Sequence, residues 1–227
     1  MKNTTKLLCA AAGICLLVSC LLTVIFQRSF DENFYEKEYA ANHQAEVINM
    51  SDEDLMKATN TLLDYLKDKR DDIVVEAEVN GIDREVFNER ETLHMVDVKN
   101  LLQNAVKARN ILFGAGALLL ALLLYVYRKM PYTIVHYAYC AGLIVMGILI
   151  AFVSIWAIVD FDTFWVDFHY LFFDNDLFFL DPNTSIMINM FPDTFFFDLV
   201  RDIVAEFIAI AAGCGVCLFF WKKKIER

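Results

Sequence analysis

Four long hydrophobic runs, separated by polar segments, divide this 227-residue chain. They cover residues 7–26, 111–127, 132–159 and 200–221. A helix needs about 20 apolar residues to cross about 30 Å of hydrocarbon. Backbone groups inside lipid must be satisfied within their own segment, so we expect helices rather than strands. The pattern predicts a mainly α membrane protein with four transmembrane helices.

The polar segment 28–110 predicts a small α+β cap. Ser51 followed by Asp54 is typical of a helix start, and we expect a helix near 52–68. Residues 73–79 alternate as a strand does, and Asn80-Gly81 predicts a tight turn into a partner strand around 84–87. A second helix near 91–109 would lead into the second span.

The distribution of charge predicts the orientation. Segment 28–110 contains nineteen acidic and eleven basic residues, and segment 160–198 contains eight acidic residues and no basic one. In the rest of the chain, Lys and Arg lie mainly beside the spans. By the positive-inside rule, both termini are cytoplasmic and both acidic segments are extracellular. We therefore expect five parts: 1–27, the first transmembrane helix; 28–110, the extracytoplasmic cap; 111–159, helices two and three; 160–199, an aromatic extracytoplasmic loop; and 200–227, the fourth helix with a basic cytoplasmic tail.

Two further patterns bear on the class of protein. Leu17-Val18-Ser19-Cys20 is similar to a lipobox, but the apolar run continues to residue 26, so we expect an uncleaved helix. The net charge of −10 and the lack of a basic patch argue against a nucleic-acid partner.

The segment 161–197 is unusually aromatic: thirteen of its thirty-seven residues are Phe, Trp or Tyr, and none is Lys or Arg. Two prolines and several aspartates argue against a spanning helix. We expect a segment at the membrane surface that places aromatic rings in the apolar layer. The rings that we expect to form a dry wall are Trp165, Phe168, Tyr170, Phe172 and Phe173.

Two of the four histidines are candidates for chemistry. His94 follows Arg90 and precedes Asp97 within one turn of a predicted helix, and His169 lies within the aromatic segment. A structural role, satisfied by a hydrogen bond, is the alternative for both. We expect His43 to be solvated and His136 to pack inside the third span.

The residues around both histidines resemble a known family. The matching blocks are Arg90-Glu91-x-x-His94-Met95-x-Asp97-Val98-Lys99, Phe168-His169-x-Leu171-Phe172-Phe173, Asn175-Asp176-x-x-x-Leu180-Asp181-Pro182 and Phe191-Pro192-x-x-Phe195-Phe196. Together with the number of spans, they resemble the bacterial lipoprotein intramolecular transacylases. One departure is Phe178-Phe179, where the family pattern leads us to expect a Trp.

The resemblance implies an acyltransferase that acts on a diacylglyceryl lipoprotein. The reaction moves the sn-2 acyl chain to the N-terminal cysteine amine, giving the lyso form. His94 and His169 would be catalytic, with no metal and no cofactor. Imidazole is a suitable base for the substrate ammonium, and we expect His94, held by Asp97, to be that base, with the reverse assignment left open. We expect Arg90 and Asp181 to organise the joint between the cap and the membrane helices, membrane lipid to be a partner, and the protein to be a monomer.

Two other function classes remain open. A metal-dependent hydrolase could use both histidines with Asp97 or Asp181, but no HExxH-like ligand pair supports it. A non-catalytic membrane protein could bind lipid or a protein partner through its aromatic loop, as interfacial aromatic belts do.

Overall fold

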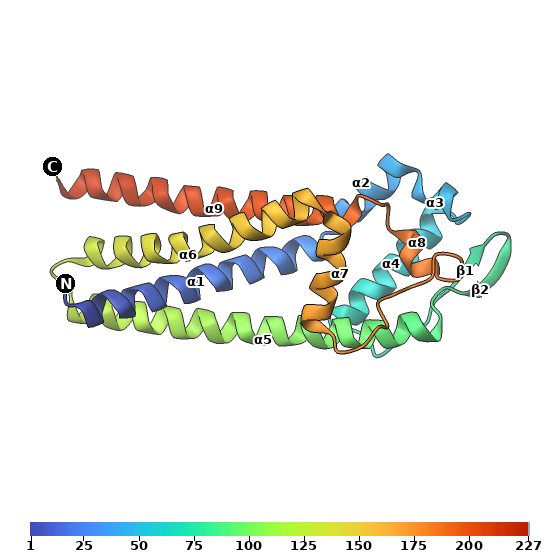
Figure 1. Ribbon diagram of the computed structural model, residues 1–227, viewed down its shortest axis with the longest axis horizontal. Coiled ribbons are helices and arrows are strands. Elements are labelled where there is room, and N and C mark those ends of the chain that lie inside the picture. Colours follow the sequence, from blue (N-terminus) through green and yellow to red (C-terminus); the bar gives the residue numbers. More distant parts are fainter. Residues whose placement is uncertain (227) are drawn as a thin grey trace. The chain divides into compact units, whose positions relative to one another are not determined.

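Four long helices dominate the computed structural model, which describes residues 1–226 (Figure 1). They are α1 (Asn3–Ser29), α5 (Glu89–Val126), α6 (Pro131–Val159) and α9 (Phe195–Ile225), and each is long and apolar enough to cross a membrane. Together with a small two-stranded sheet, they confirm the predicted fold class. Helix α5 is longer than expected because no proline interrupts residues 89–126, so the cap helix and the second span are continuous.

The chain divides into two compact units. The helical unit contains residues 1–27, 105–160 and the chain from Val200 onward, and the cap unit contains residues 28–104 and 161–199. The aromatic segment 161–197 therefore belongs to the same compact unit as the polar segment 28–104.

Close approach of small residues holds the helical unit together. A Cβ atom added to Gly13 of α1 would meet the Ala138 carbonyl oxygen of α6 at 1.8 Å, and one added to Gly142 would meet the Gly13 backbone at 2.7 Å. A Cβ atom added to Gly116 of α5 would meet the Cys15 and Leu16 side chains of α1 at 3.0 Å. Because lipid gives no hydrophobic drive for helices to associate, such backbone-to-backbone packing is a main source of their attraction.

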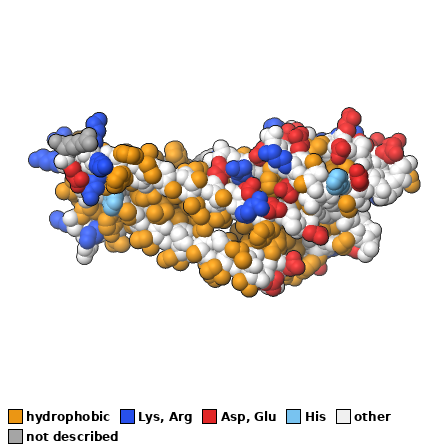
Figure 2. Space-filling view, turned by 90° about the horizontal axis from the view of Figure 1, so that it is seen from above, with side chains coloured by type: hydrophobic (Ala, Val, Ile, Leu, Met, Phe, Trp, Pro, Cys, Tyr) orange, Lys and Arg blue, Asp and Glu red, His pale blue; other side chains and the backbone are white. Residues whose placement is uncertain are grey.

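Hydrogen bonds between helices add to this packing. The hydroxyl group of Thr5 in α1 lies 2.7 Å from that of Tyr127, the residue after α5, and the Tyr139 hydroxyl of α6 donates to the Ala211 carbonyl of α9 at 2.9 Å. Hydrophobic side chains cover the outer surface of these helices, and Lys and Arg gather at the end that carries both chain termini (Figure 2). This surface suits a hydrocarbon environment.

The cap unit has its own hydrophobic core. Helices α2 (Glu32–Asn42), α3 (Gln44–Val47) and α4 (Asp52–Leu66) surround it, and Phe195 at the start of α9 is fully buried in it. Ser51 caps α4 by accepting a hydrogen bond from the Asp54 amide at 3.0 Å, as its sequence signature predicts.

A short hairpin completes the cap unit. Strand β1 (Glu76–Val79) pairs antiparallel with β2 (Ile82–Glu85). Strand β1 is shorter than the expected strand 73–79, and β2 begins two residues before the expected 84–87. Asn80 and Gly81 connect them with φ values of +55° and +76°. Two consecutive positive φ angles are the requirement of a type I′ turn, which explains the Asn-Gly pair.

The aromatic segment is more ordered than a loop. Its first part forms helix α7 (Phe161–Phe172), and a single turn, α8 (Ile186–Met190), follows Pro182. No Gly or Pro occurs between residues 161 and 181, so nothing in that stretch prevents a helix from forming. The segment expected as an aromatic loop thus contains a helix at residues 161–172.

Candidate active site

His94 lies one turn beyond the start of α5. That start is a reciprocal cap, in which the Asn88 amide donates to the Glu91 carboxylate at 2.6 Å and the Glu91 amide donates to the Asn88 side chain at 3.0 Å. The His94 side chain is buried, and its Nδ1 atom has no hydrogen-bond partner among residues 1–226. Nδ1 is thus enclosed by the protein without a polar partner.

Burial sets the charge state of His94. Loss of hydration, with a smaller contribution from the neighbouring His169, lowers the pKa of His94 to about 4, against the opposing effect of the Asp97 carboxylate. The imidazole is consequently neutral at pH 7. Asp97 does not hold Nδ1 as expected, since it accepts a hydrogen bond from the Asn175 side chain at 2.9 Å instead.

His169 lies near the end of α7 and is also buried. Its Nδ1 atom is 2.7 Å from the carbonyl oxygen of Trp165, one turn earlier on the helix. A carbonyl oxygen can only accept, so Nδ1 carries the proton and Nε2 carries the lone pair. Burial lowers the pKa of His169, and the hydrogen bond to Trp165 partly opposes that shift. This histidine therefore presents a neutral ring with Nε2 as its basic atom.

The two imidazole rings are neighbours. Their centroids are 5.9 Å apart with an angle of 35° between the ring planes, although 75 residues separate them in the chain (169 − 94). Phe173 contacts both rings, at 5.5 Å from His94 and 5.8 Å from His169. The space between α5 and α7 thus contains two titratable groups beside an aromatic wall.

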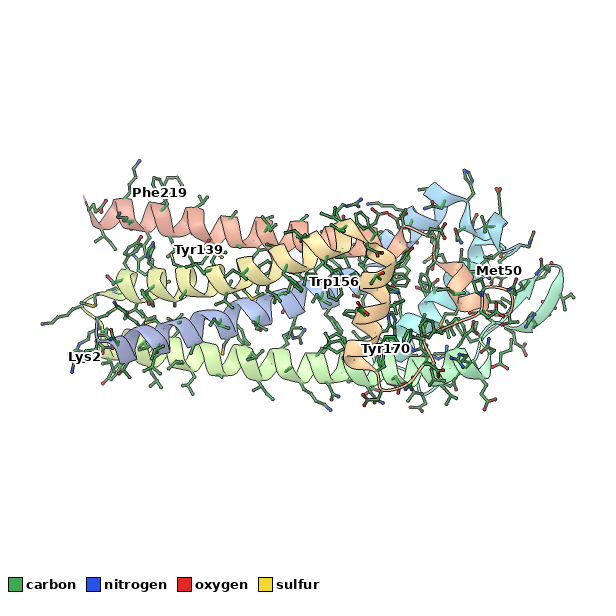
Figure 3. The ribbon with its side chains drawn as sticks, viewed as in Figure 1. Lys2, Met50, Tyr139, Trp156, Tyr170 and Phe219 are labelled. Atoms are coloured by element: carbon green, nitrogen blue, oxygen red, sulfur yellow. The ribbon has the colours of Figure 1, made fainter. Side chains whose placement is uncertain are left out.

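Of the five predicted wall residues, three contact an imidazole. Trp165 lies 5.0 Å from His169, and Phe168 and Phe173 are each 5.8 Å from it. The other two do not contact a histidine ring. Phe172 packs on Phe168, while Tyr170, labelled in Figure 3, is 56% exposed and packs on Phe178 and Phe179.

Arg90 and Asp97 both attach the loop after α7 to helix α5. The Arg90 guanidinium donates to the carbonyl oxygens of Phe179 and Asp176, and Asp97 holds Asn175. Asp181 has a local role, since its carboxylate accepts from the Asn183 amide and side chain at 2.9 Å each. Arg90 and Asp97 thus join this loop to the first turns of α5, whereas the Asp181 carboxylate bonds within its own turn.

Sequence reasoning missed two residues of this region. Phe178 stacks on His169 at 4.7 Å; the family pattern marks an aromatic position there, but the contact arises only when the loop returns across α7 in the folded chain. Glu91 is fully buried and accepts hydrogen bonds from Asn88, from the Ser185 hydroxyl and from the Met187 amide. The Asn88-x-x-Glu91 spacing is a capping-box signal that could have identified its local partner.

No group of three or more His, Cys, Asp or Glu side chains is arranged to hold a metal ion within the described residues. The six cysteines are free and all lie in the spanning helices, so the cap unit contains no thiol.

A family model, described as lipoprotein intramolecular transacylase Lit, matches residues 10–196. The chain belongs to this family. It is accordingly a membrane-integral transacylase, which is an acyltransferase. Both histidines lie inside the matched range. A search of curated proteins finds no match.

Solved structures of a Lit protein share the fold. The membrane-integral lipoprotein intramolecular transacylase Lit from Bacillus cereus superimposes with a TM-score of 0.82 at 18% identity, covering 100% of this chain and 99% of that one. Two variants of the same protein, each with one histidine replaced, by arginine or by alanine, have TM-scores of 0.77 at 17% identity. Each covers 99% of this chain and 96% of the other.

Proposed function

We propose that this Lit-family chain moves an acyl chain from the sn-2 oxygen of a diacylglyceryl cysteine to the α-amine of that cysteine. The substrate is a lipoprotein whose signal peptide has been removed, and the product is its lyso form. The family name supports a lipoprotein substrate. The pair of buried, neutral imidazoles is the observation that carries the reaction type.

The substrate supplies its own nucleophile. The cysteine amine attacks the ester carbonyl, the glyceryl oxygen leaves, and an amide and a free hydroxyl replace the amine and the ester. The absence of any cysteine from the described cap unit fits a mechanism without an enzyme thiol. Holding the amine and the carbonyl together within one molecule is worth up to about 7–11 kcal/mol.

His169 is the better base of the pair. Its Nδ1 proton is held by the Trp165 carbonyl, so Nε2 can accept a proton from the substrate amine and return it to the departing glyceryl oxygen. This reverses the assignment that we favoured from the sequence. His94 is neutral, and its imidazole suits a hydrogen bond to the substrate carbonyl.

The aromatic rings around His169 exclude water. Trp165, Phe173 and Phe178 offer no proton acceptor or nucleophile to the reacting ester, and their bulk takes the place of solvent. Water in this position would hydrolyse the ester and release a fatty acid. The rings thus favour transfer over hydrolysis.

The reaction also requires an orientation. We place both termini in the cytoplasm and the cap unit outside the bacterial cell membrane, working as a monomer among membrane lipids. Eight Lys and Arg residues flank the spans at the termini and at the 128–129 turn, against one acid there, and this asymmetry supports the assignment. The histidine pair is then on the side where exported lipoproteins carry their lipidated cysteine.

Mass spectrometry of lipoprotein N-terminal peptides from cells with and without the protein tests the proposal. Expression should convert diacylglyceryl cysteine into N-acyl, monoacylglyceryl cysteine at unchanged mass, which fragmentation distinguishes. Unchanged lipopeptides, with the protein present in the membrane, would overturn the proposal and favour a non-catalytic binding role.

A further inference from the structure

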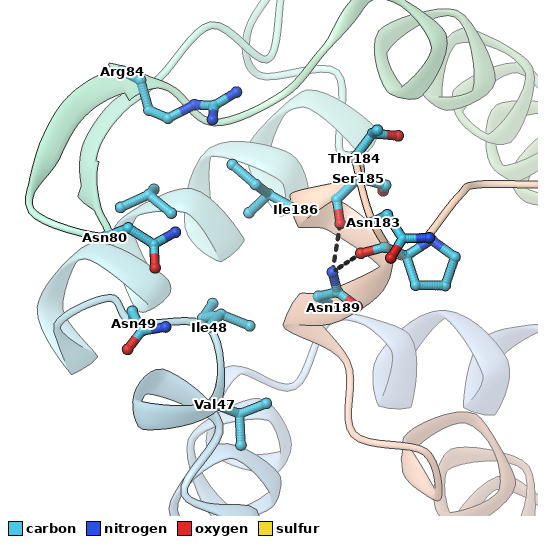
Figure 4. A pocket seen from close by; sticks show the side chains of 12 residues that line it. Val47, Ile48, Asn49, Asn80, Arg84, Asn183, Thr184, Ser185, Ile186 and Asn189 are labelled. Atoms are coloured by element: carbon cyan, nitrogen blue, oxygen red, sulfur yellow. Dashed lines mark hydrogen bonds between the residues drawn. The ribbon is translucent and has the colours of Figure 1, made fainter.

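The cap unit contains a cavity that is not lined by either histidine of the pair. Its volume is about 350 Å³, within the usual range of about 300–1,000 Å³ for ligand sites. The hairpin, the segment 47–49 and the segment 182–189 form its walls (Figure 4). Unlike the aromatic site, it combines apolar side chains with four amides and one arginine: Asn49, Asn80, Asn183, Asn189 and Arg84.

The charge of this cavity differs from that of the chain. The protein has 30 acidic residues and a net charge of −10, yet none of the residues lining the cavity is Asp or Glu. The pleat of the hairpin explains why its carboxylates do not line the cavity, because side chains alternate between the two faces of a strand. Its four carboxylates, Glu76, Glu78, Asp83 and Glu85, share one face, while Arg84 lies on the other face opposite Ala77.

Three polar side chains of the cavity have no partner among residues 1–226. No hydrogen bond or ion pair joins the side chains of Arg84, Asn49 or Asn80 to another residue in the described chain. Figure 4 shows the Arg84 guanidinium extending from the hairpin toward the wall that contains Thr184 and Ile186. These groups are available to a ligand without breaking an existing interaction.

The opposite wall is held rigidly. The Asn189 side chain donates to the Pro182 and Ser185 carbonyls at 2.6 and 2.9 Å, as drawn in Figure 4. The Gln44 side chain donates to the Asn189 carbonyl at 2.6 Å. The cavity therefore has one fixed wall and, facing it, the unpartnered side chains of the hairpin and of segment 47–49.

We propose that this cavity binds the polypeptide of the lipoprotein substrate just beyond its lipidated cysteine, and that Arg84 favours an acidic residue there. This inference rests on the proposed function. An amide side chain carries both a donor and an acceptor, which matches the N–H and C=O groups of an extended peptide. A phosphate offers acceptors only, and a sugar site would be expected to present an aromatic platform, which the lining residues do not include.

A physical connection links the cavity to the histidine pair. Ser185 lines the cavity, and its hydroxyl donates to the buried Glu91 carboxylate on α5, three residues before His94. Positions three apart on a helix lie on the same face. The wall of the cavity is thus joined through Ser185 to the helical turn that carries His94.

The test of this site uses two synthetic diacylglyceryl-cysteine peptides. They are identical except that one has Asp and the other has Asn in the residues after the cysteine. With the purified full chain, the Asp peptide should have the lower KM. Arg84→Gln should raise that KM about three- to tenfold, to the value of the Asn peptide, with kcat unchanged. Lys37→Gln is the matched control, because Lys37 is an exposed cation of the cap unit that does not line this cavity.

A binding measurement with the same two peptides, now carrying a fluorescent label, and with the protein in nanodiscs tests this inference separately from the proposed function. If wild type binds the Asp peptide more tightly and Arg84→Gln abolishes this preference, the cavity site is supported. That holds even if neither peptide is converted, and the lack of conversion would then refute only the proposed function. Equal binding of both peptides to wild type and Arg84→Gln overturns the site. The site is also overturned if Lys37→Gln weakens binding as much as Arg84→Gln.

Discussion

The imidazole rings of His94 and His169 lie 5.9 Å apart, brought together by helices that start 72 residues apart in the chain (161 − 89). Each ring is buried and neutral, and only His169 has its Nδ1 atom bound to a carbonyl. The two histidines are thus inequivalent, and we expect them to contribute to the reaction in different ways.

Replacing His169 with Ala should lower kcat by about 10²–10⁴-fold, because a positioned base contributes about that factor. His94→Ala should also lower kcat, through loss of the hydrogen bond to the substrate carbonyl. Conversion of a diacylglyceryl-cysteine peptide by purified protein measures both effects. His43→Ala, at an exposed histidine of the same unit, should retain full activity. Full activity of either buried-site variant would remove that histidine from the mechanism.

The buried histidines should make stability depend on pH. The pKa of His94 is lowered to about 4, below its ordinary 6.5, so the unfolded chain binds its proton first as the pH falls. The contribution of neutral His94 to the stability of the fold is then complete above pH 6.5. It is lost as the pH falls from 6.5 to about 4, and the loss is at most about 3 kcal/mol. Thermal unfolding of wild type and His94→Gln at pH 7 and pH 4.5 measures this. An equal loss of stability in both proteins would contradict the burial of His94.

Phe178 should matter more than its neighbour Phe179. Phe178 stacks on His169 at 4.7 Å, whereas Phe179 packs on Phe178 and Tyr170 and is 48% exposed. Aromatic contacts of this kind are worth about 0.5–1.5 kcal/mol. Phe178→Ala should therefore lower kcat about two- to tenfold, and Phe178→Trp should restore it. The prediction fails if Phe179→Ala has the larger effect on kcat.

Glu91 should be the acidic residue that contributes most to the stability of the cap unit. Glu91→Ala leaves the Ser185 hydroxyl and the Met187 and Asn88 amides without their acceptor, which should cost about 2–4 kcal/mol of stability. Glu89→Ala, at an exposed acid of the same helical turn, should change stability by no more than about 0.5 kcal/mol. Chemical or thermal unfolding of the two variants in detergent gives the comparison; similar midpoints would contradict the role of Glu91.

The sequence predicts the spans well because each depends on a local property, the length of an apolar run. Helix α4 and the Asn80-Gly81 turn were also predictable, since caps and tight turns have local signatures. Helix α7 was not, because its aspartates and aromatic rings concealed a helical stretch.

The site was only partly predictable for the same reason. His94 and His169 were candidates from their surroundings in the sequence, but their contact depends on how α7 packs against α5. The Trp165 carbonyl that fixes the His169 tautomer has no sequence signal, so the base could not be assigned beforehand. Phe178 reaches His169 through a returning loop, which only the tertiary structure shows.

The most direct test of the central claim uses two synthetic diacylglyceryl-cysteine peptides of different sequence, one carrying an isotope label in its sn-2 acyl chain. Both are incubated together with the purified protein and analysed by fragmentation. An intramolecular transfer places the label on the cysteine nitrogen of the labelled peptide only, with no free fatty acid. Label on the nitrogen of the other peptide, or release of labelled fatty acid, would contradict the account.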